Sequence, residues 1–246
     1  MAGHSHSANI AVRKGKQDAS RARLFSKLAR YIMIAAKNGG GDPDTNLRLR
    51  YAIEKARGVS MPKDNIERAV KKGTGDLEGE IYEEITYEGY GPGGVAIMVE
   101  SLTDNRNRTG GEVRTTFEKL GGNLGTPGCV SYMFERKGLF FIDAKKYPDE
   151  DAVMTVCLEA EADDFQKQGD VYEVSCDPSK FTVVGEALAA AKIIALEAEV
   201  KNLPMTVATV DVETGKKVVR LIDALDANDD VQNVYTNANL TDEMMG

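Results

Sequence analysis

The sequence predicts a multidomain α+β protein: an N-terminal three-helix domain followed by two α+β domains of the ferredoxin-like, split βαβ kind, the third inserted in the second. Apolar residues recur at helical spacing before Gly75, and runs rich in Ile, Val and Tyr follow it. Residues 138–201 then show the order β-α-β-β-α-β. A chain of 246 residues with 42% hydrophobic content is long enough for several domains.

The first domain is predicted over residues 1–75. Residues 1–16 lack apolar periodicity and form a basic arm. Helices are expected at 18–38, at 45–57 and from Pro62 to Gly73, because Leu, Ile and Ala recur on one face of each. Glycines end all three segments, and proline is tolerated in the first turn of the third.

The second domain is predicted to be discontinuous, 76–135 plus 204–246, with residues 136–203 inserted as the third. Its expected elements are strands at 81–90, 95–102, 130–135, 205–210 and 231–236, and helices at 105–120 and 214–227. The inserted domain is expected to have strands at 138–143, 163–167, 171–176 and 193–200, and helices at 149–160 and 179–191.

The net charge of −8 conceals a strong asymmetry along the chain. Residues 1–75 carry a net charge of +10, and residues 76–246 carry −18. Such a division favours binding of a polyanion through the basic part. The alternative is that both parts present solvated helical faces.

Two groups of cations are candidates for nucleic-acid binding. The first lies in the arm and the first helix: Arg13, Lys14, Lys16, Arg21, Arg23, Lys27 and Arg30. The second, Arg106 and Arg108, opens the helix at 105–120, where Asp104 or Asn105 can cap the backbone. Cations at the positive end of a helix are unfavourable unless an anion is near, so a phosphate or an internal carboxylate, such as those of Glu83, Glu84 and Glu88, would have to balance them.

Enzyme chemistry is not indicated, and neither a cofactor, a metal nor a small-molecule substrate is expected. The only histidines, His4 and His6, lie in the arm, and the three widely spaced cysteines are expected to be small apolar residues in a reducing compartment. The GxGxxG spacing of residues 89–94 precedes a strand, which favours a hairpin turn over a dinucleotide site. Asp163-Asp164 and Asp229-Asp230 are expected on a solvated surface. No segment predicts a membrane span or a signal peptide, so a cytoplasmic protein is expected.

Several motifs in order along the chain resemble the YebC/PmpR family, to which the mitochondrial translational activator of cytochrome c oxidase is related. They include residues 2–5, 61–69, 87–94 and 103–108, and the stretch from Gly121-Gly122 to Met133-Phe134. The resemblance implies one helical and two α+β domains and a non-enzymatic cytoplasmic role. Family members are described as probable transcriptional regulators that bind DNA, and others associate with the ribosome and ease peptide-bond formation at proline-rich stretches.

The leading hypothesis is a nucleic-acid-binding regulator that acts in translation as a ribosome-associated factor contacting rRNA. A DNA-binding transcriptional regulator is the first alternative, although no recognition helix is evident. A protein-docking module without nucleic acid is the second, because the acidic part of the chain could bind a basic partner. The sequence gives no indication of the oligomeric state.

Overall fold

A computed structural model describes residues 21–77 and 82–245, and for residues 21–23 it describes the backbone only. The described residues form two compact units. The first unit comprises residues 21–30, 82–135 and 204–245, and the second comprises residues 31–77 and 136–203. Helix α2 (Arg21–Gly39) belongs to the first unit up to Arg30 and to the second from Tyr31. The division into three domains remains a prediction.

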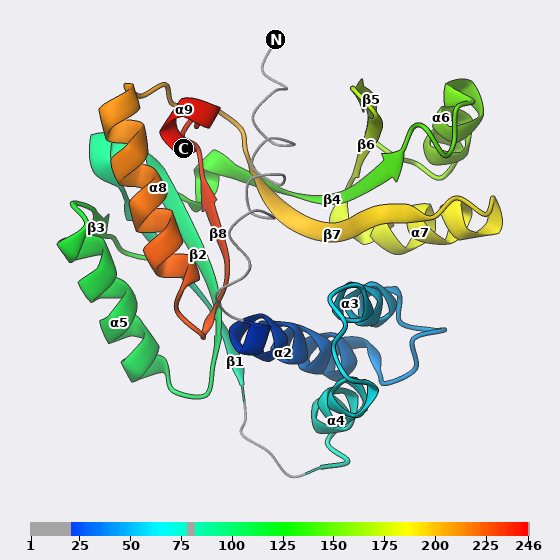
Figure 1. The fold of residues 1–246 in the computed structure, drawn as a ribbon, viewed down its shortest axis with the longest axis horizontal. Helices are drawn as coiled ribbons and strands as arrows, with labels where there is room; N and C mark the ends of the chain where they lie inside the picture. The colour runs from blue at the N-terminus through cyan, green and yellow to red at the C-terminus, as the bar shows by residue number, and fades with distance from the viewer. Residues whose placement is uncertain (1–20, 78–81, 246) are drawn as a thin grey trace. The chain divides into compact units, whose positions relative to one another are not determined.

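The three predicted N-terminal helices are confirmed as α2, α3 (Leu47–Gly58) and α4 (Lys63–Thr74) (Figure 1). Asn46 connects the first two, because its side chain accepts from the Leu49 N–H and donates to the carbonyls of Ala35 and Gly40. This buried amide both caps α3 and satisfies carbonyls at the end of α2. Gly75 ends α4 in the left-handed conformation, with φ of 84°.

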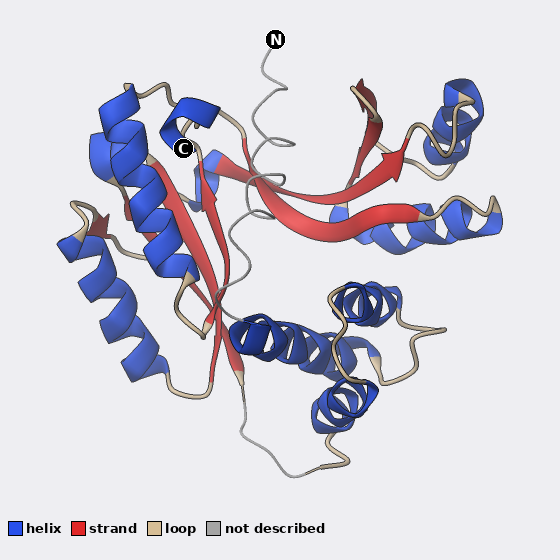
Figure 2. Ribbon diagram, in the orientation of Figure 1, coloured by secondary structure: helices blue, strands red, loops and turns tan. Residues whose placement is uncertain are grey.

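The sheet of the first unit has the strand order β3-β1-β2-β8. Strands β1 (Glu83–Tyr90) and β2 (Ala96–Thr103) pair as an antiparallel hairpin, β3 (Asn123–Leu124) joins β1, and β8 (Val231–Thr236) joins β2. Helices α5 (Arg106–Lys119) and α8 (Val212–Asp226) lie side by side on one face (Figures 1 and 2).

The core of the first unit lies between these two helices and the sheet. Val95, just before β2, and Ile97 and Val99 within it enter this core, as the alternation of side chains along a strand requires. The buried residues that form it include Val95, Ile97, Val99, Val113, Phe117, Val218, Leu221, Leu225, Val231 and Val234.

The glycine-rich segment between β1 and β2 is a hairpin connection, as the sequence predicts. Pro92–Gly94 form a short 3₁₀ turn in which Gly93 and Gly94 have φ of 76° and 73°. Residues other than glycine rarely adopt this backbone conformation. The next element is a strand and not a helix, which excludes the dinucleotide-binding interpretation of the motif.

The second unit confirms the β-α-β-β-α-β order of the inserted segment. Its elements are β4 (Phe134–Asp143), α6 (Glu150–Glu159), β5 (Asp164–Gln168), β6 (Val171–Cys176), α7 (Phe181–Ala190) and β7 (Ala195–Pro204). The strand order is β5-β6-β4-β7, and β6 is antiparallel to both of its neighbours. One core contains Phe140 and Tyr172 from the sheet and Cys157 and Phe181 from the helices. Cys157 and Cys176 are buried, Cys129 is half-buried, and all three are free thiols.

Two predicted strands differ from the structure. Of the strand predicted at 130–135, only Phe134 and Glu135 lie in a strand, β4. Ser131–Met133 form a 3₁₀ turn instead, because the carboxylate of Glu88 takes the N–H groups of Val130 and Ser131. The segment 205–210 forms only an isolated bridge, from Ala208 to Ala238. Helix α9 (Asp242–Met245), which packs on α8, was not predicted.

Candidate nucleic-acid interface

The predicted cations of α2 that the structure describes are partnered within the first unit. The Lys27 ammonium donates to the backbone carbonyl of Asp226 and lies 3.2 Å from its Oδ1 atom. Arg30 donates to the carbonyl of Asp229, and its Nη1 atom lies 3.0 Å from Oδ1 of Asp230. Both side chains are mostly buried, so these two cations hold α2 against the loop between α8 and β8.

Asp230 is the centre of this contact and is only 3% exposed. Its Oδ2 atom accepts from Thr109 Oγ1 at 2.6 Å, from Arg108 Nη2 at 2.7 Å and from Thr103 Oγ1 at 3.2 Å. Burial disfavours its charged form, but the hydrogen bonds from Arg108 and Thr109 outweigh burial and lower the pKa of the carboxyl. The expectation of a solvated surface is therefore wrong for Asp230.

The two arginines of the second predicted group, Arg106 and Arg108, have different environments. Asn105 caps α5 by accepting from the Arg108 N–H, as expected. The Arg108 guanidinium binds Asp104 and Asp230, both at 2.7 Å, so internal aspartates and not the Glu83–Glu88 strand balance its charge. Arg106 is exposed, and its backbone carbonyl accepts from the Tyr87 hydroxyl at 3.4 Å.

The remaining predicted positions fall outside what the structure describes. Arg13, Lys14 and Lys16, together with His4 and His6, precede the described residues, and the side chains of Arg21 and Arg23 are also not described. The assignment of all nine cations to nucleic-acid binding stays a prediction. Lys27, Arg30 and Arg108 would first have to leave internal carboxylates before they could bind phosphate.

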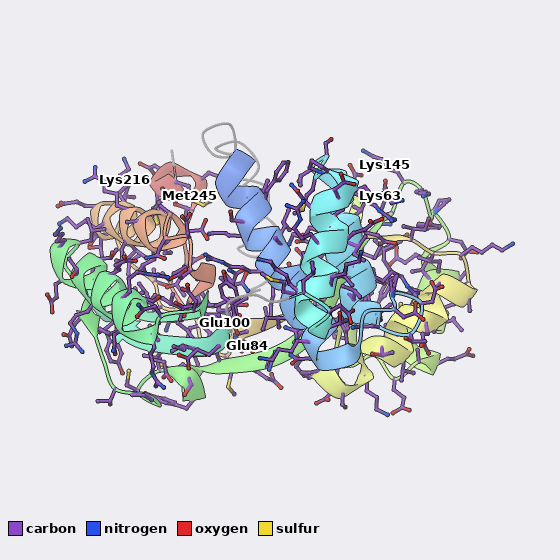
Figure 3. The ribbon with its side chains drawn as sticks, turned by 90° about the horizontal axis from the view of Figure 1, so that it is seen from below. Lys63, Glu84, Glu100, Lys145, Lys216 and Met245 are labelled. Atoms are coloured by element: carbon purple, nitrogen blue, oxygen red, sulfur yellow. The ribbon has the colours of Figure 1, made fainter. Side chains whose placement is uncertain are left out.

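Exposed cations that were not singled out in the sequence lie on α4. Arg68, Lys71 and Lys72 have i, i+3 and i+4 spacing, which places them on one helix face, and all three are exposed, whereas Ile66 and Ala69 of the same helix are buried. Among the described residues, none of these three has a carboxylate partner. Lys63, which Figure 3 labels at the start of α4, instead pairs with Glu67 at 3.4 Å. The signal for this face was present in the sequence as the amphipathic spacing of α4.

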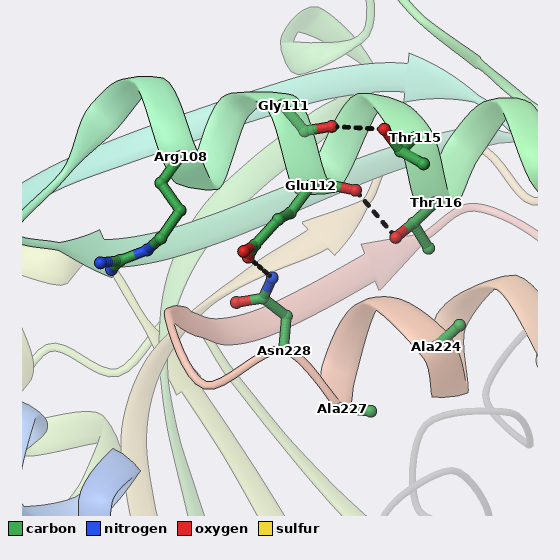
Figure 4. A pocket seen from close by; sticks show the side chains of 8 residues that line it. All are labelled: Arg108, Gly111, Glu112, Thr115, Thr116, Ala224, Ala227 and Asn228. Atoms are coloured by element: carbon green, nitrogen blue, oxygen red, sulfur yellow. Dashed lines mark hydrogen bonds between the residues drawn. The ribbon is translucent and has the colours of Figure 1, made fainter.

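A surface pocket of about 620 Å³ lies between α5 and α8 (Figure 4). Glu112 and Asn228 close part of it with a hydrogen bond of 2.7 Å, and the hydroxyls of Thr115 and Thr116 donate to backbone carbonyls of their own helix. These polar groups of the pocket lining therefore already have hydrogen-bond partners within the protein. Within residues 21–77 and 82–245, no cluster of His, Cys, Asp or Glu side chains could hold a metal ion. Nor does that part of the chain contain a helix with the length and hydropathy needed to cross a membrane.

These features define the class of the protein. It is an α+β protein whose N-terminal helices present exposed cations, while residues 76–246 carry a net negative charge. Family models identify it further, because the model of the TACO1/YebC protein N-terminal domain matches residues 5–76 and that of the TACO1/YebC second and third domain matches residues 82–238. The chain belongs to the TACO1/YebC family.

Relatives extend over the full chain. A probable transcriptional regulatory protein of Clostridium novyi is 51% identical over 246 residues, which is all of both chains. One of the same description from Geobacter sulfurreducens is 51% identical over 245 residues, covering 100% of this chain and 98% of the relative. The crystal structure of a conserved hypothetical protein from Aquifex aeolicus matches with a TM-score of 0.80 and 46% identity, covering 93% of this chain and 94% of that one.

Proposed function

We propose that the protein is a non-enzymatic, nucleic-acid-binding regulator of gene expression that acts in the cytoplasm as a ribosome-associated translation factor contacting rRNA. The observation that carries this proposal is the exposed cationic face of α4, formed by Arg68, Lys71 and Lys72. Membership of the TACO1/YebC family and the regulatory names of its relatives support the general class.

The cationic face of α4 suits a sugar–phosphate backbone better than a base edge. Lysine and arginine near phosphates release condensed counterions, which gives affinity without reading sequence. Base reading in duplex DNA needs side chains delivered into a groove, and the solvent face of α4 has Asp64 and Glu67 beside its cations. Binding through this face therefore fits a large structured RNA. The basic arm, with Arg13, Lys14, Lys16, Arg21 and Arg23, would add further phosphate contacts.

Ribosome co-sedimentation tests the proposal. The variant Arg68→Gln/Lys71→Gln/Lys72→Gln is compared with Lys216→Gln/Lys217→Gln/Arg220→Gln, which removes three exposed cations from α8 in the same chain. We expect the α4 variant to lose about tenfold or more in affinity for ribosomes at fixed salt and the α8 variant to change little. An equal loss of ribosome affinity in both variants would mean that binding depends on net charge alone and not on the position of the cations. Unchanged ribosome affinity in both variants would exclude α4 as the interface.

A DNA-binding transcriptional regulator remains the second candidate, because the relatives are named probable transcriptional regulatory proteins. It requires that one duplex be preferred over random competitor DNA by about 10³-fold or more at fixed salt. Titration of ribosomes, deproteinised rRNA and random duplex DNA under one salt condition separates the two. A preference for a specific duplex over ribosomes would replace the translation proposal.

A further inference from the structure

The loop that connects β3 to β4 is held in one conformation by a buried carboxylate. Glu88 of β1, 7% exposed, accepts from the backbone N–H groups of Gly128, Val130 and Ser131 at 2.8, 2.9 and 2.8 Å. The hydroxyl of Tyr90 donates to the carbonyl of Cys129 at 2.8 Å. A loop with this many internal hydrogen bonds presents its remaining side chains in a fixed arrangement.

What the loop presents is apolar. Tyr132 is 70% exposed, although the nearby Val130 is fully buried. The Met205 N–H donates to the carbonyl of Met133 at 2.9 Å, which places 64% exposed Met205 next to the loop, and Val207 follows at 44% exposed. Tyr132, Met205 and Val207 are here called the Tyr132 patch. Tyrosine and methionine are enriched at the centres of protein interfaces.

The charge of the surrounding unit identifies the kind of partner. Residues 82–135 and 204–245 contain sixteen acidic and seven basic residues, a net charge of −9, and adding residues 21–30 of the same unit leaves it at −5. The acidic segments 82–135 and 204–245, which carry the patch, would repel a phosphate backbone, and nucleic-acid stacking sites normally lie in positively charged grooves. We propose that the Tyr132 patch is the docking surface for a basic protein, which buries the tyrosine and methionine side chains and is attracted by the acidic unit around them.

This inference rests on the proposed function in one respect only, the choice of the ribosome as the particle that carries the basic protein. A ribonucleoprotein offers both an RNA backbone for the α4 face and basic proteins for the Tyr132 patch. The two surfaces should therefore be separable by removing either the protein or the RNA from that particle. The residue at 132 can also report directly, because the chain contains no tryptophan and a Tyr132→Trp variant has a single indole fluorophore.

The experiment has two arms. In the first, Tyr132→Ala/Met205→Ser is compared with Leu196→Ala, which truncates an apolar side chain that is also 64% exposed, in binding to intact ribosomes and to the same ribosomes' deproteinised rRNA. We expect about a tenfold loss on ribosomes for the double variant, no loss on rRNA, and no effect of Leu196→Ala. In the second, the Tyr132→Trp variant is titrated with the basic protein fraction extracted from ribosomes, and a saturable emission change is expected.

The outcomes separate the two proposals. An equal loss on deproteinised rRNA would make the patch a base-contacting surface and overturn the inference, as would an unchanged affinity for ribosomes. If the wild-type protein bound neither ribosomes nor rRNA, the proposed function would fail, and a saturable emission change with the protein fraction would still support docking. Absence of that emission change overturns the docking surface in every case.

Discussion

Arg30 and Asp230 form an ion pair of 3.0 Å that joins α2 to the loop before β8, and Arg108 binds the same carboxylate from α5. One buried aspartate thus fixes two of the arginines that the sequence nominates for nucleic-acid binding. This arrangement gives these cations a structural function within the first unit, whether or not a phosphate ever displaces the carboxylate.

Replacing Asp230 with Asn should destabilise the protein by about 3 kcal/mol, because two arginines lose their common counter-charge. The carboxyl pKa is lowered in the folded state, so its contribution is present above the usual aspartate pKa and is lost as the pH falls through the folded value. Urea unfolding of both proteins at neutral pH and at about pH 3 measures this. The difference in unfolding free energy between the wild-type protein and Asp230→Asn should be smaller at the acidic pH. An equal difference at both pH values would contradict a contribution from the ionised carboxylate. Glu118→Gln, at an exposed site on α5, is the control.

Glu88→Gln should loosen the loop at 125–133 while leaving the sheet intact. Burial opposes ionisation of Glu88, but hydrogen bonds from the N–H groups of Gly128, Val130 and Ser131 lower its pKa, and an amide accepts such bonds less strongly. Hydrogen exchange should accelerate at those three amides, with a stability loss of about 2 kcal/mol. Glu84→Gln, exposed on the same strand, should leave all three protected. Unchanged protection in both variants would show that the loop is held by other contacts.

The second unit contains a further charge network on β7. The Lys55 ammonium lies 3.2 Å from Glu197 and 3.7 Å from Glu199, and Lys201 also pairs with Glu199. Burial opposes the charged form of Glu199, but the two lysines keep its pKa below the usual value. Glu199→Gln should therefore cost about 3 kcal/mol at neutral pH and progressively less in acid. Glu186→Gln, exposed on α7, should have no such effect, and a pH-independent loss in Glu199→Gln would refute the charge mechanism.

The proposed role of the α4 face predicts how the affinity for RNA depends on salt concentration. If Arg68, Lys71 and Lys72 each contact phosphate, the slope of log affinity against log salt should become shallower by about 2 to 3 in the triple Gln variant. Binding to deproteinised rRNA at several salt concentrations gives the slope. A weaker affinity with an unchanged slope would mean that the substitutions act through the fold and not through counterion release.

The sequence predicted most of the fold because its strongest signals are local. Helical spacing, strand-rich runs and glycine stops identified α2 to α4, the β1–β2 hairpin and the βαββαβ segment. The pairing of charges was not predictable, since Arg30 and Asp230 meet only after the chain has folded. Glu88 illustrates the same limit: it lies in an acid-rich strand that suggested a partner for arginines, yet its burial directs it to backbone N–H groups. Exposed Tyr132 had no sequence signal of its own.

Two glycines within helices should respond with opposite signs to alanine. At Gly73 of α4, an added Cβ would collide with the Met33 carbonyl oxygen and lie 2.8 Å from the Ala36 Cβ, so Gly73→Ala should force α2 and α4 apart and cost about 2 kcal/mol. At Gly111 of α5, no atom beyond its chain neighbours and the adjoining helix backbone lies within 4 Å of the added Cβ, so Gly111→Ala should stabilise the helix by up to about 1 kcal/mol. Urea unfolding followed by circular dichroism measures both. If Gly111→Ala weakened ribosome binding while raising stability, the pocket between α5 and α8 would belong to the interface; unchanged binding would leave this glycine without a role there.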